Sequence, residues 1–155
     1  MWRSPALVLS IVALLAAPAL AEPEPIDWDW KERHRGGRDE QVWGGLARNR
    51  DELRRLWKLY DQPGKPPVIG FEKNVAVVAG AIGSSSCPAR LYDVRLNRER
   101  KRVVVRMYEE DSGTDVCTAD VVPRTFSVSI ARRDLKPLSA GELKLRPREI
   151  EDPGE

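Results

Sequence analysis

The sequence is poor in the residues that most often carry chemistry, since its 155 residues include one histidine and two cysteines. These are too few nitrogen and sulfur ligands for a zinc site, and the acidic residues lack the spacing of a calcium loop. We therefore expect neither a metal nor a cofactor. Charge is nearly balanced, with 26 Lys and Arg against 24 Asp and Glu. The net charge of +2 gives no reason to expect nucleic acid or an anionic membrane as a partner.

Catalytic patterns are missing as well. His34 is the only histidine, and a base among the charged residues and glycines around it would not keep the geometry that catalysis needs. The segment Gly83–Cys87 reads G-S-S-S-C, and its last residue is not the glycine of a nucleophile elbow. We therefore expect no enzymatic activity. The alternative is a small secreted hydrolase whose acidic catalytic residues the sequence does not identify.

Long hydrophobic runs are absent except at the N-terminus. Residues 1–21 combine one charge, Arg3, with an apolar run and the small-residue pattern Ala19-Leu20-Ala21. This combination predicts a Sec-type signal peptide cleaved after Ala21. The run is too short for a membrane anchor, which needs about 20 apolar residues. We expect a periplasmic or secreted protein with no membrane span after cleavage.

The predicted export determines how the two cysteines are interpreted. Cys87 and Cys117 lie after the signal, and an isolated pair in an oxidising compartment most often forms a disulfide. Their spacing does not fit the C-x-x-C of a redox or metal site. We therefore predict a Cys87–Cys117 disulfide.

The middle of the chain predicts a mainly β domain of the α+β class over residues 41–135. One N-terminal helix at about residues 49–60 is capped by Asn49 and packs Leu53, Leu56, Trp57 and Tyr60 on the sheet. Short strands with charged turns favour a small antiparallel β-sandwich or meander. The predicted strands cover residues 74–82, 91–96, 102–108, 116–122 and 124–131, with Tyr92, Val94 and Leu96 on one face.

The two flanking segments read as loose. Residues 22–40 are a polar leader with several Pro and Gly breakers, predicted to be a flexible arm whose Trp28 and Trp30 contact a partner. The alternative is that Ile26, Trp28 and Trp30 form a short edge strand. Residues 136–155 carry charges punctuated by prolines and are predicted to be a loose C-terminal tail.

Three motifs carry a family resemblance. E-L-x-x-L-W at Glu52–Trp57 is followed by P-P-V-I-x-F at Pro66–Phe71, and then by a small-residue strand and turn at Ala76–Gly83. From Asp51 to Ile130 the chain thus resembles the C-terminal domain of PrcB-type protease complex subunits. The family usually has T-G-G-Y in this turn, where the present chain has serines.

A second group of sequences shares that turn. G-S-S-S-C-P at Gly83–Pro88 and C-T-A-D-V-V-P-R-T at Cys117–Thr125 resemble uncharacterised exported bacterial proteins. The resemblances imply a β-rich exported module that binds or stabilises another protein, with a secreted protease or envelope complex as the first candidate. Ser84, Ser85 and Ser86 are the candidate contacts beside the two tryptophans. A protease-inhibitor-like binder that uses the turn at residues 84–87 as a wedge is the other binding alternative, and the oligomeric state stays open.

Overall fold

The protein is described here from a computed structural model, which describes residues 23–34, 41–110 and 116–150. The predicted signal peptide lies outside the described residues. The strands are β1 (Glu24–Pro25), β2 (Trp28–His34), β3 (Val42–Ala47), β4 (Asn74–Gly83), β5 (Ala89–Asn97), β6 (Arg102–Glu109), β7 (Val122–Ala131) and β8 (Lys144–Glu149). The helix α1 (Arg50–Leu59) follows β3, and a 3-10 helix η1 (Arg132–Leu135) follows β7.

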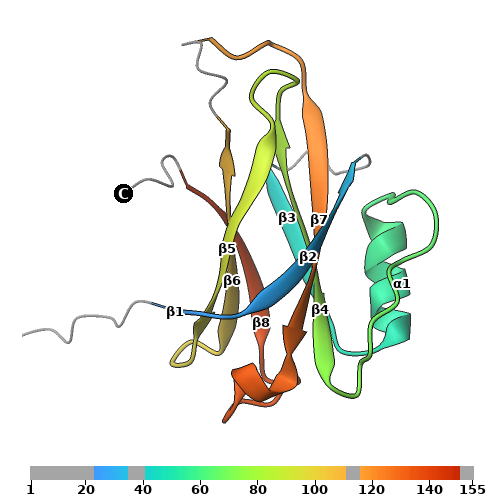
Figure 1. The fold of residues 1–155 in the computed structure, drawn as a ribbon, viewed down its shortest axis with the longest axis vertical. Helices are drawn as coiled ribbons and strands as arrows, with labels where there is room; N and C mark the ends of the chain where they lie inside the picture. The colour runs from blue at the N-terminus through green and yellow to red at the C-terminus, as the bar shows by residue number, and fades with distance from the viewer. Residues whose placement is uncertain (1–22, 35–40, 111–115, 151–155) are drawn as a thin grey trace, which may run out of the picture.

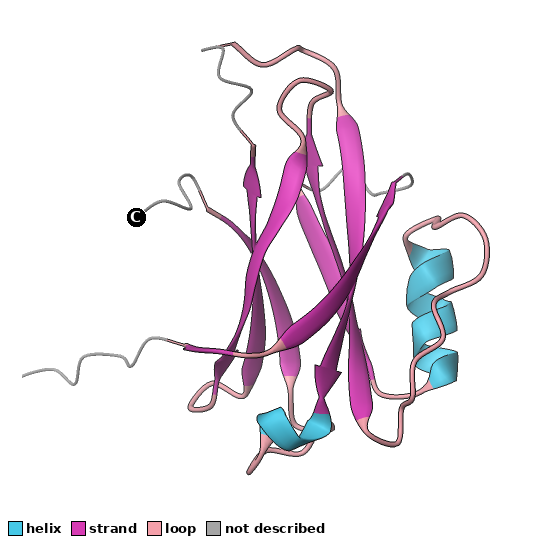
Figure 2. Ribbon diagram, viewed as in Figure 1, coloured by secondary structure: helices cyan, strands magenta, loops and turns pink. Residues whose placement is uncertain are grey.

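The strands form two four-stranded sheets that face each other (Figures 1 and 2). Sheet A has the order β1-β5-β6-β8, and sheet B has the order β2-β7-β4-β3. All pairs are antiparallel except β6–β8, which is parallel. The predicted fold class, a mainly β α+β sandwich with one helix, is confirmed. Among the described helices, none has the length and apolar character needed to cross a bilayer.

Strand β4 is buried on both of its faces, as its small apolar residues predict. Val75 and Val77 point into the core between the sheets, whereas Ala76 and Val78 belong to the second cluster, under α1. Because side chains alternate along a strand, one strand serves both clusters.

The helix covers the outer face of sheet B. The Asn49 side chain caps it by accepting a hydrogen bond from the Glu52 backbone N–H at 2.9 Å. Leu53 and Trp57 are 1% and 3% exposed, in the same cluster as Trp43 of β3. The predicted helix and its core-facing side are confirmed.

The prediction of a flexible leader is wrong for the described residues. β2 pairs along seven residues of β7, and β1 pairs with β5. Ile26, between them, is 7% exposed, and its N–H donates to the Val94 carbonyl at 2.9 Å. The edge-strand alternative is correct for Trp28 and Trp30, which lie in β2, whereas Ile26 lies between the two strands. The segment pairs because the open edges of β5 and β7 offer it backbone partners.

The prediction of a loose C-terminal tail is also wrong for residues 136–150. Leu143 is 1% exposed in the core, and β8 pairs with β6 over six residues. Pro147 is tolerated within β8 because this strand lies at the edge of sheet A, where the second side needs no backbone donor. The tail therefore completes the sheet that a shorter domain would leave open.

Two local predictions fail for reasons of geometry. A bulge between Leu91 and Asp93 takes Tyr92 out of the backbone register with β6, so Tyr92 is 37% exposed and does not share the buried face of Val94. Residues 116–121 form a loop rather than a strand, and β7 begins at Val122.

Candidate functional site

The cysteines join two loops at one end of the sandwich. Cys87 and Cys117 are bonded, with their Cα atoms 5.5 Å apart, so the predicted disulfide is confirmed. Cys87 lies in the turn between β4 and β5, and Cys117 lies in the loop that leads into β7, at the top of Figure 1. We call residues 84–88 together with residues 117–120 the stapled turn.

Ser84 builds the turn from inside. Its backbone N–H donates to the Cys87 carbonyl at 2.9 Å, and its hydroxyl accepts from the Cys87 N–H at 2.9 Å. The residue is 3% exposed. Of the three serines predicted to contact a partner, Ser84 is therefore occupied in holding the turn, while Ser85 is exposed and Ser86 is half-buried.

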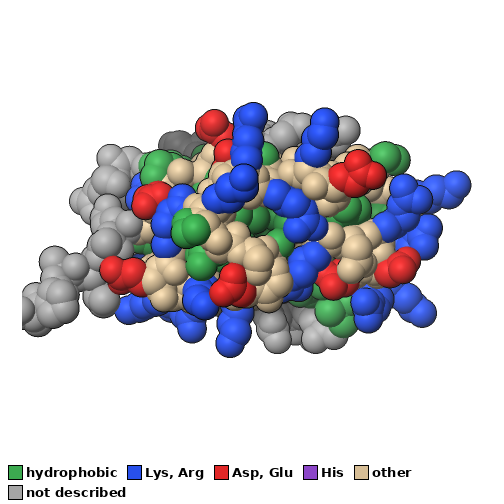
Figure 3. All heavy atoms as spheres, turned by 90° about the horizontal axis from the view of Figure 1, so that it is seen from below, with side chains coloured by type: hydrophobic (Ala, Val, Ile, Leu, Met, Phe, Trp, Pro, Cys, Tyr) green, Lys and Arg blue, Asp and Glu red, His purple; other side chains and the backbone are tan. Residues whose placement is uncertain are grey.

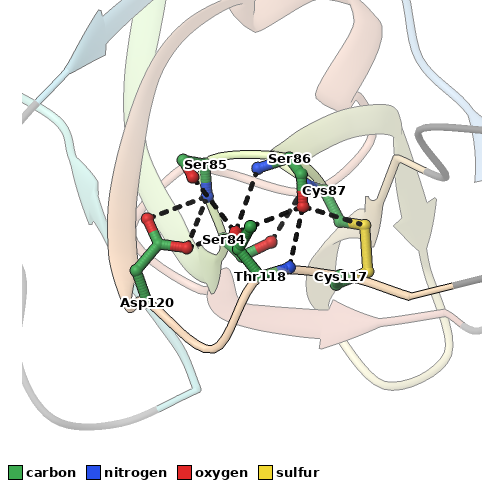
Figure 4. The surroundings of a disulfide bond; sticks show 7 residues. All are labelled: Ser84, Ser85, Ser86, Cys87, Cys117, Thr118 and Asp120. Atoms are coloured by element: carbon green, nitrogen blue, oxygen red, sulfur yellow. Dashed lines mark hydrogen bonds between the residues drawn. A yellow bond between two sulfur atoms is a disulfide. The ribbon is translucent and has the colours of Figure 1, made fainter. Parts of the chain in front are cut away.

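Thr118 and Asp120 tie the two loops together beside the disulfide (Figure 4). The Thr118 backbone N–H donates to the Ser86 hydroxyl at 2.8 Å, and the hydroxyls of Thr118 and Ser85 are 3.0 Å apart. The Ser85 backbone N–H donates to both carboxylate oxygens of Asp120 at 3.2 Å. The tip is thus fixed by hydrogen bonds as well as by the covalent bond.

Asp120 brings a fixed negative charge to this tip. The hydrogen bond from the Thr118 hydroxyl and those from Ser85 hold the pKa of its carboxyl below the ordinary value. Asp120 is exposed and forms no ion pair within the described part of the chain. It stays available to a donor or cation on another molecule.

Glycine is required just before the turn. A Cβ on Gly83 would lie 2.4 Å from the Ala89 backbone nitrogen and 2.7 Å from the Cys87 carbonyl oxygen. Both neighbours are backbone atoms, which do not move aside as a flexible side chain does. The first residue of the G-S-S-S-C-P motif is thereby explained by close approach.

The hydroxyls of the stapled turn bond to one another and to one carboxylate. The side-chain hydrogen bonds across the turn join serine, threonine and aspartate, and the hydroxyl of Thr118 donates to the Asp120 carboxylate. Within residues 23–34, 41–110 and 116–150, no group of three or more His, Cys, Asp or Glu side chains is placed to hold a metal ion.

The two predicted contact groups do not lie together. Trp28 and Trp30 are in β2, where their backbones pair with Ile130 and Val128 of β7. Val128 is six residues along β7 from its start beside the stapled turn, which is about 20 Å at 3.3 Å per residue. The two tryptophans therefore belong to an edge strand of sheet B rather than to an arm beside the turn.

Thr118 and Asp120 were not anticipated as site residues. The available signal was their position in C-T-A-D directly after Cys117, because a disulfide brings its immediate neighbours onto the partner turn. Comparison of the chain with protein-family models, curated proteins and solved structures finds no match.

Proposed function

We propose that the protein is exported through its N-terminal signal and acts as a non-enzymatic interaction module that presents the stapled turn to a partner protein. The observation that carries the proposal is the fixed geometry of an exposed loop pair, held by one disulfide and the Ser85–Thr118–Asp120 hydrogen bonds. A preordered loop loses little conformational entropy on binding.

Two exposed apolar side chains support a contact at this end. Val116 is 77% exposed and Val121 is 68% exposed, immediately before and after the residues of the stapled turn. Exposed apolar side chains beside polar groups fit the mixed composition of a protein interface, which combines apolar and polar surface. The partner class, a secreted protease or envelope complex, rests on the PrcB-type resemblance alone.

A photo-crosslinking pair tests the proposal. A photoreactive amino acid replaces Val121 in one variant and Val68, which is 96% exposed in the loop after α1, in the control. In a native envelope preparation we expect one discrete protein adduct from position 121 and none from position 68. The adduct should weaken when Thr118→Val removes the hydroxyl that joins the two loops.

Other outcomes would contradict the proposal. Equal adducts from positions 121 and 68, or an adduct that Thr118→Val leaves unchanged, would show that the stapled turn is not the contact. If the captured partner is a protease, its activity with and without the purified protein separates an inhibitor wedge from a stabilising subunit.

A further inference from the structure

The outer face of sheet A concentrates positive charge. The strand register places Asp93, Arg106 and Arg148 in one row across β5, β6 and β8. The next rows are Arg95, Val104 and Arg146, and then Asn97, Arg102 and Lys144. We call these nine residues the basic face; it holds six cationic side chains and one carboxylate, a charge of +5 in a chain of net charge +2.

Alternation along the strands fixes which way these side chains point. Val103, Val105 and Met107 of β6 are fully buried in the core between the sheets. The residues between them must therefore face away from sheet B. Lys144, Arg146 and Arg148 are exposed, whereas Leu145 between them packs against the core.

The single carboxylate compensates only two of the cations. Asp93 accepts hydrogen bonds from Arg106 Nε at 2.7 Å and from Arg95 Nε at 2.8 Å. Burial alone raises the pKa of Asp93, but these bonds outweigh it and hold the pKa below the ordinary value, so the carboxylate stays ionised. Arg106 also lies over the Tyr92 ring, 4.8 Å from its centroid.

The other four cations have no ion pair within the described part of the chain: Arg102, Lys144, Arg146 and Arg148. The end of the molecule seen from below differs, because acidic side chains lie among the basic ones there (Figure 3). At that end Lys101 pairs with Glu142 at 2.9 Å, and Arg133 pairs with Asp134 at 3.4 Å.

We propose that the basic face docks on the phosphate-bearing surface of an anionic lipid bilayer. Its cations form a two-dimensional grid, spaced about 4.8 Å across strands and about 6.6 Å along them. A linear polyanion would engage one row of such a grid, whereas a planar array of headgroups engages all of it. The face has little apolar surface to insert, since Val104 at its centre is 9% exposed, so the attraction is electrostatic.

The disulfide favours this occupant over nucleic acid. A Cys87–Cys117 bond is typical of compartments outside the cytosol and nucleus, where the protein meets membrane surfaces rather than the nucleic acid of the cell. The inference is independent of the stapled turn, which stands at an end of the sandwich rather than on this face. A peripheral contact of this kind would hold the turn at the membrane surface.

Vesicle sedimentation of the purified protein tests the proposal. The variant Lys144→Gln/Arg146→Gln/Arg148→Gln removes three cations of the basic face, and the control Arg54→Gln/Arg55→Gln/Lys58→Gln removes three from the exposed side of α1. With vesicles containing 30% phosphatidylglycerol in low salt, each lost cation should weaken binding about fivefold. The β8 variant should therefore bind about 100-fold more weakly, and the control should bind as the wild type does.

A second, milder variant guards against unfolding of an edge strand. Arg102→Gln in β6 should reduce binding about fivefold with an unchanged melting curve. Binding should disappear in 0.5 M NaCl and on pure phosphatidylcholine vesicles. Equal losses in the β8 variant and the helix control, retained binding to phosphatidylcholine, or tighter binding to a single-stranded oligonucleotide than to the anionic vesicles would each overturn the proposal.

Discussion

The disulfide closes a segment of 30 residues, and replacing both Cys87 and Cys117 with alanine opens it. In the chain-entropy model a loop of 30 residues restricts the unfolded chain by about 12 cal/mol/K, or about 3.6 kcal/mol at 25 °C. The closed segment contains β5 and β6, the two central strands of sheet A. Loss of the disulfide therefore raises the conformational entropy of the unfolded chain in the segment that forms the centre of sheet A.

The hydrogen bonds of the stapled turn should not compensate for the stability lost with the disulfide. The hydrogen bonds that Thr118 makes with Ser85 and Ser86 are exposed, so each adds at most about 0.5–1.5 kcal/mol and they remain present in the variant. We expect the free energy of unfolding to fall by about 3–4 kcal/mol, with the fold retained in the absence of denaturant.

Urea titration followed by tryptophan fluorescence measures the effect. Wild-type protein with reductant should show the same loss, and denatured unreduced protein should contain no free thiol. As a control, Val68→Ala at a 96% exposed site should change stability by no more than about 0.5 kcal/mol. A loss below about 1 kcal/mol for the double alanine variant would refute the entropic reasoning.

The other predictions concern the helix, the N-terminal strands and one ion pair. Trp57→Ala should lower the free energy of unfolding by about 3–5 kcal/mol, because Trp57 is 3% exposed. The surface change Arg54→Ala should lower it by less than about 0.5 kcal/mol. Equal small losses for both variants in urea titrations would contradict the helix packing. Removing residues 23–34 should lower the melting temperature by at least about 4 °C, since it opens an edge of each sheet, and an unchanged melting temperature would count against their role. Asp93 has a folded-state pKa below 3.8, so its contribution is present above that pH and is lost as the pH falls through the lower value. The stability difference between wild type and Asp93→Asn should therefore narrow in urea titrations below pH 3.8, and a gap that widens there would refute the ion-pair account.

Elements with a strong local signal were predictable from the sequence. The helix has an Asn49 cap and an apolar stripe, and β4 has an unbroken apolar run, so periodicity alone placed both. The termini were not predictable in the same way. β1, β2 and β8 are short or charged, and pairing with the edge of another strand stabilises them. β1 and β2 pair with β5 and β7, which lie more than 60 residues later in the sequence, and β8 forms a parallel pair with β6.

In the candidate site, too, one feature was predictable from the sequence and the others depend on the fold. The disulfide followed from compartment and cysteine count, without any knowledge of the fold. The inward position of Ser84 and the contacts of Thr118 and Asp120 depend on how two loops meet in space. Only the bonded cysteines linked those loops in the sequence, and composition gave no measure of which hydroxyls point outward.

Net charge was the least informative quantity, because it sums over faces that never meet the same partner. A value of +2 is compatible with an even mixture of charges and with a face of +5 balanced elsewhere. Alternation is the signal that distinguishes them: K-L-R-P-R at Lys144–Arg148 places a cation at every second residue. In a strand that spacing puts all three on one side, whereas in a loose tail it means nothing. The charged surface could therefore be predicted only if residues 144–149 were first identified as a strand.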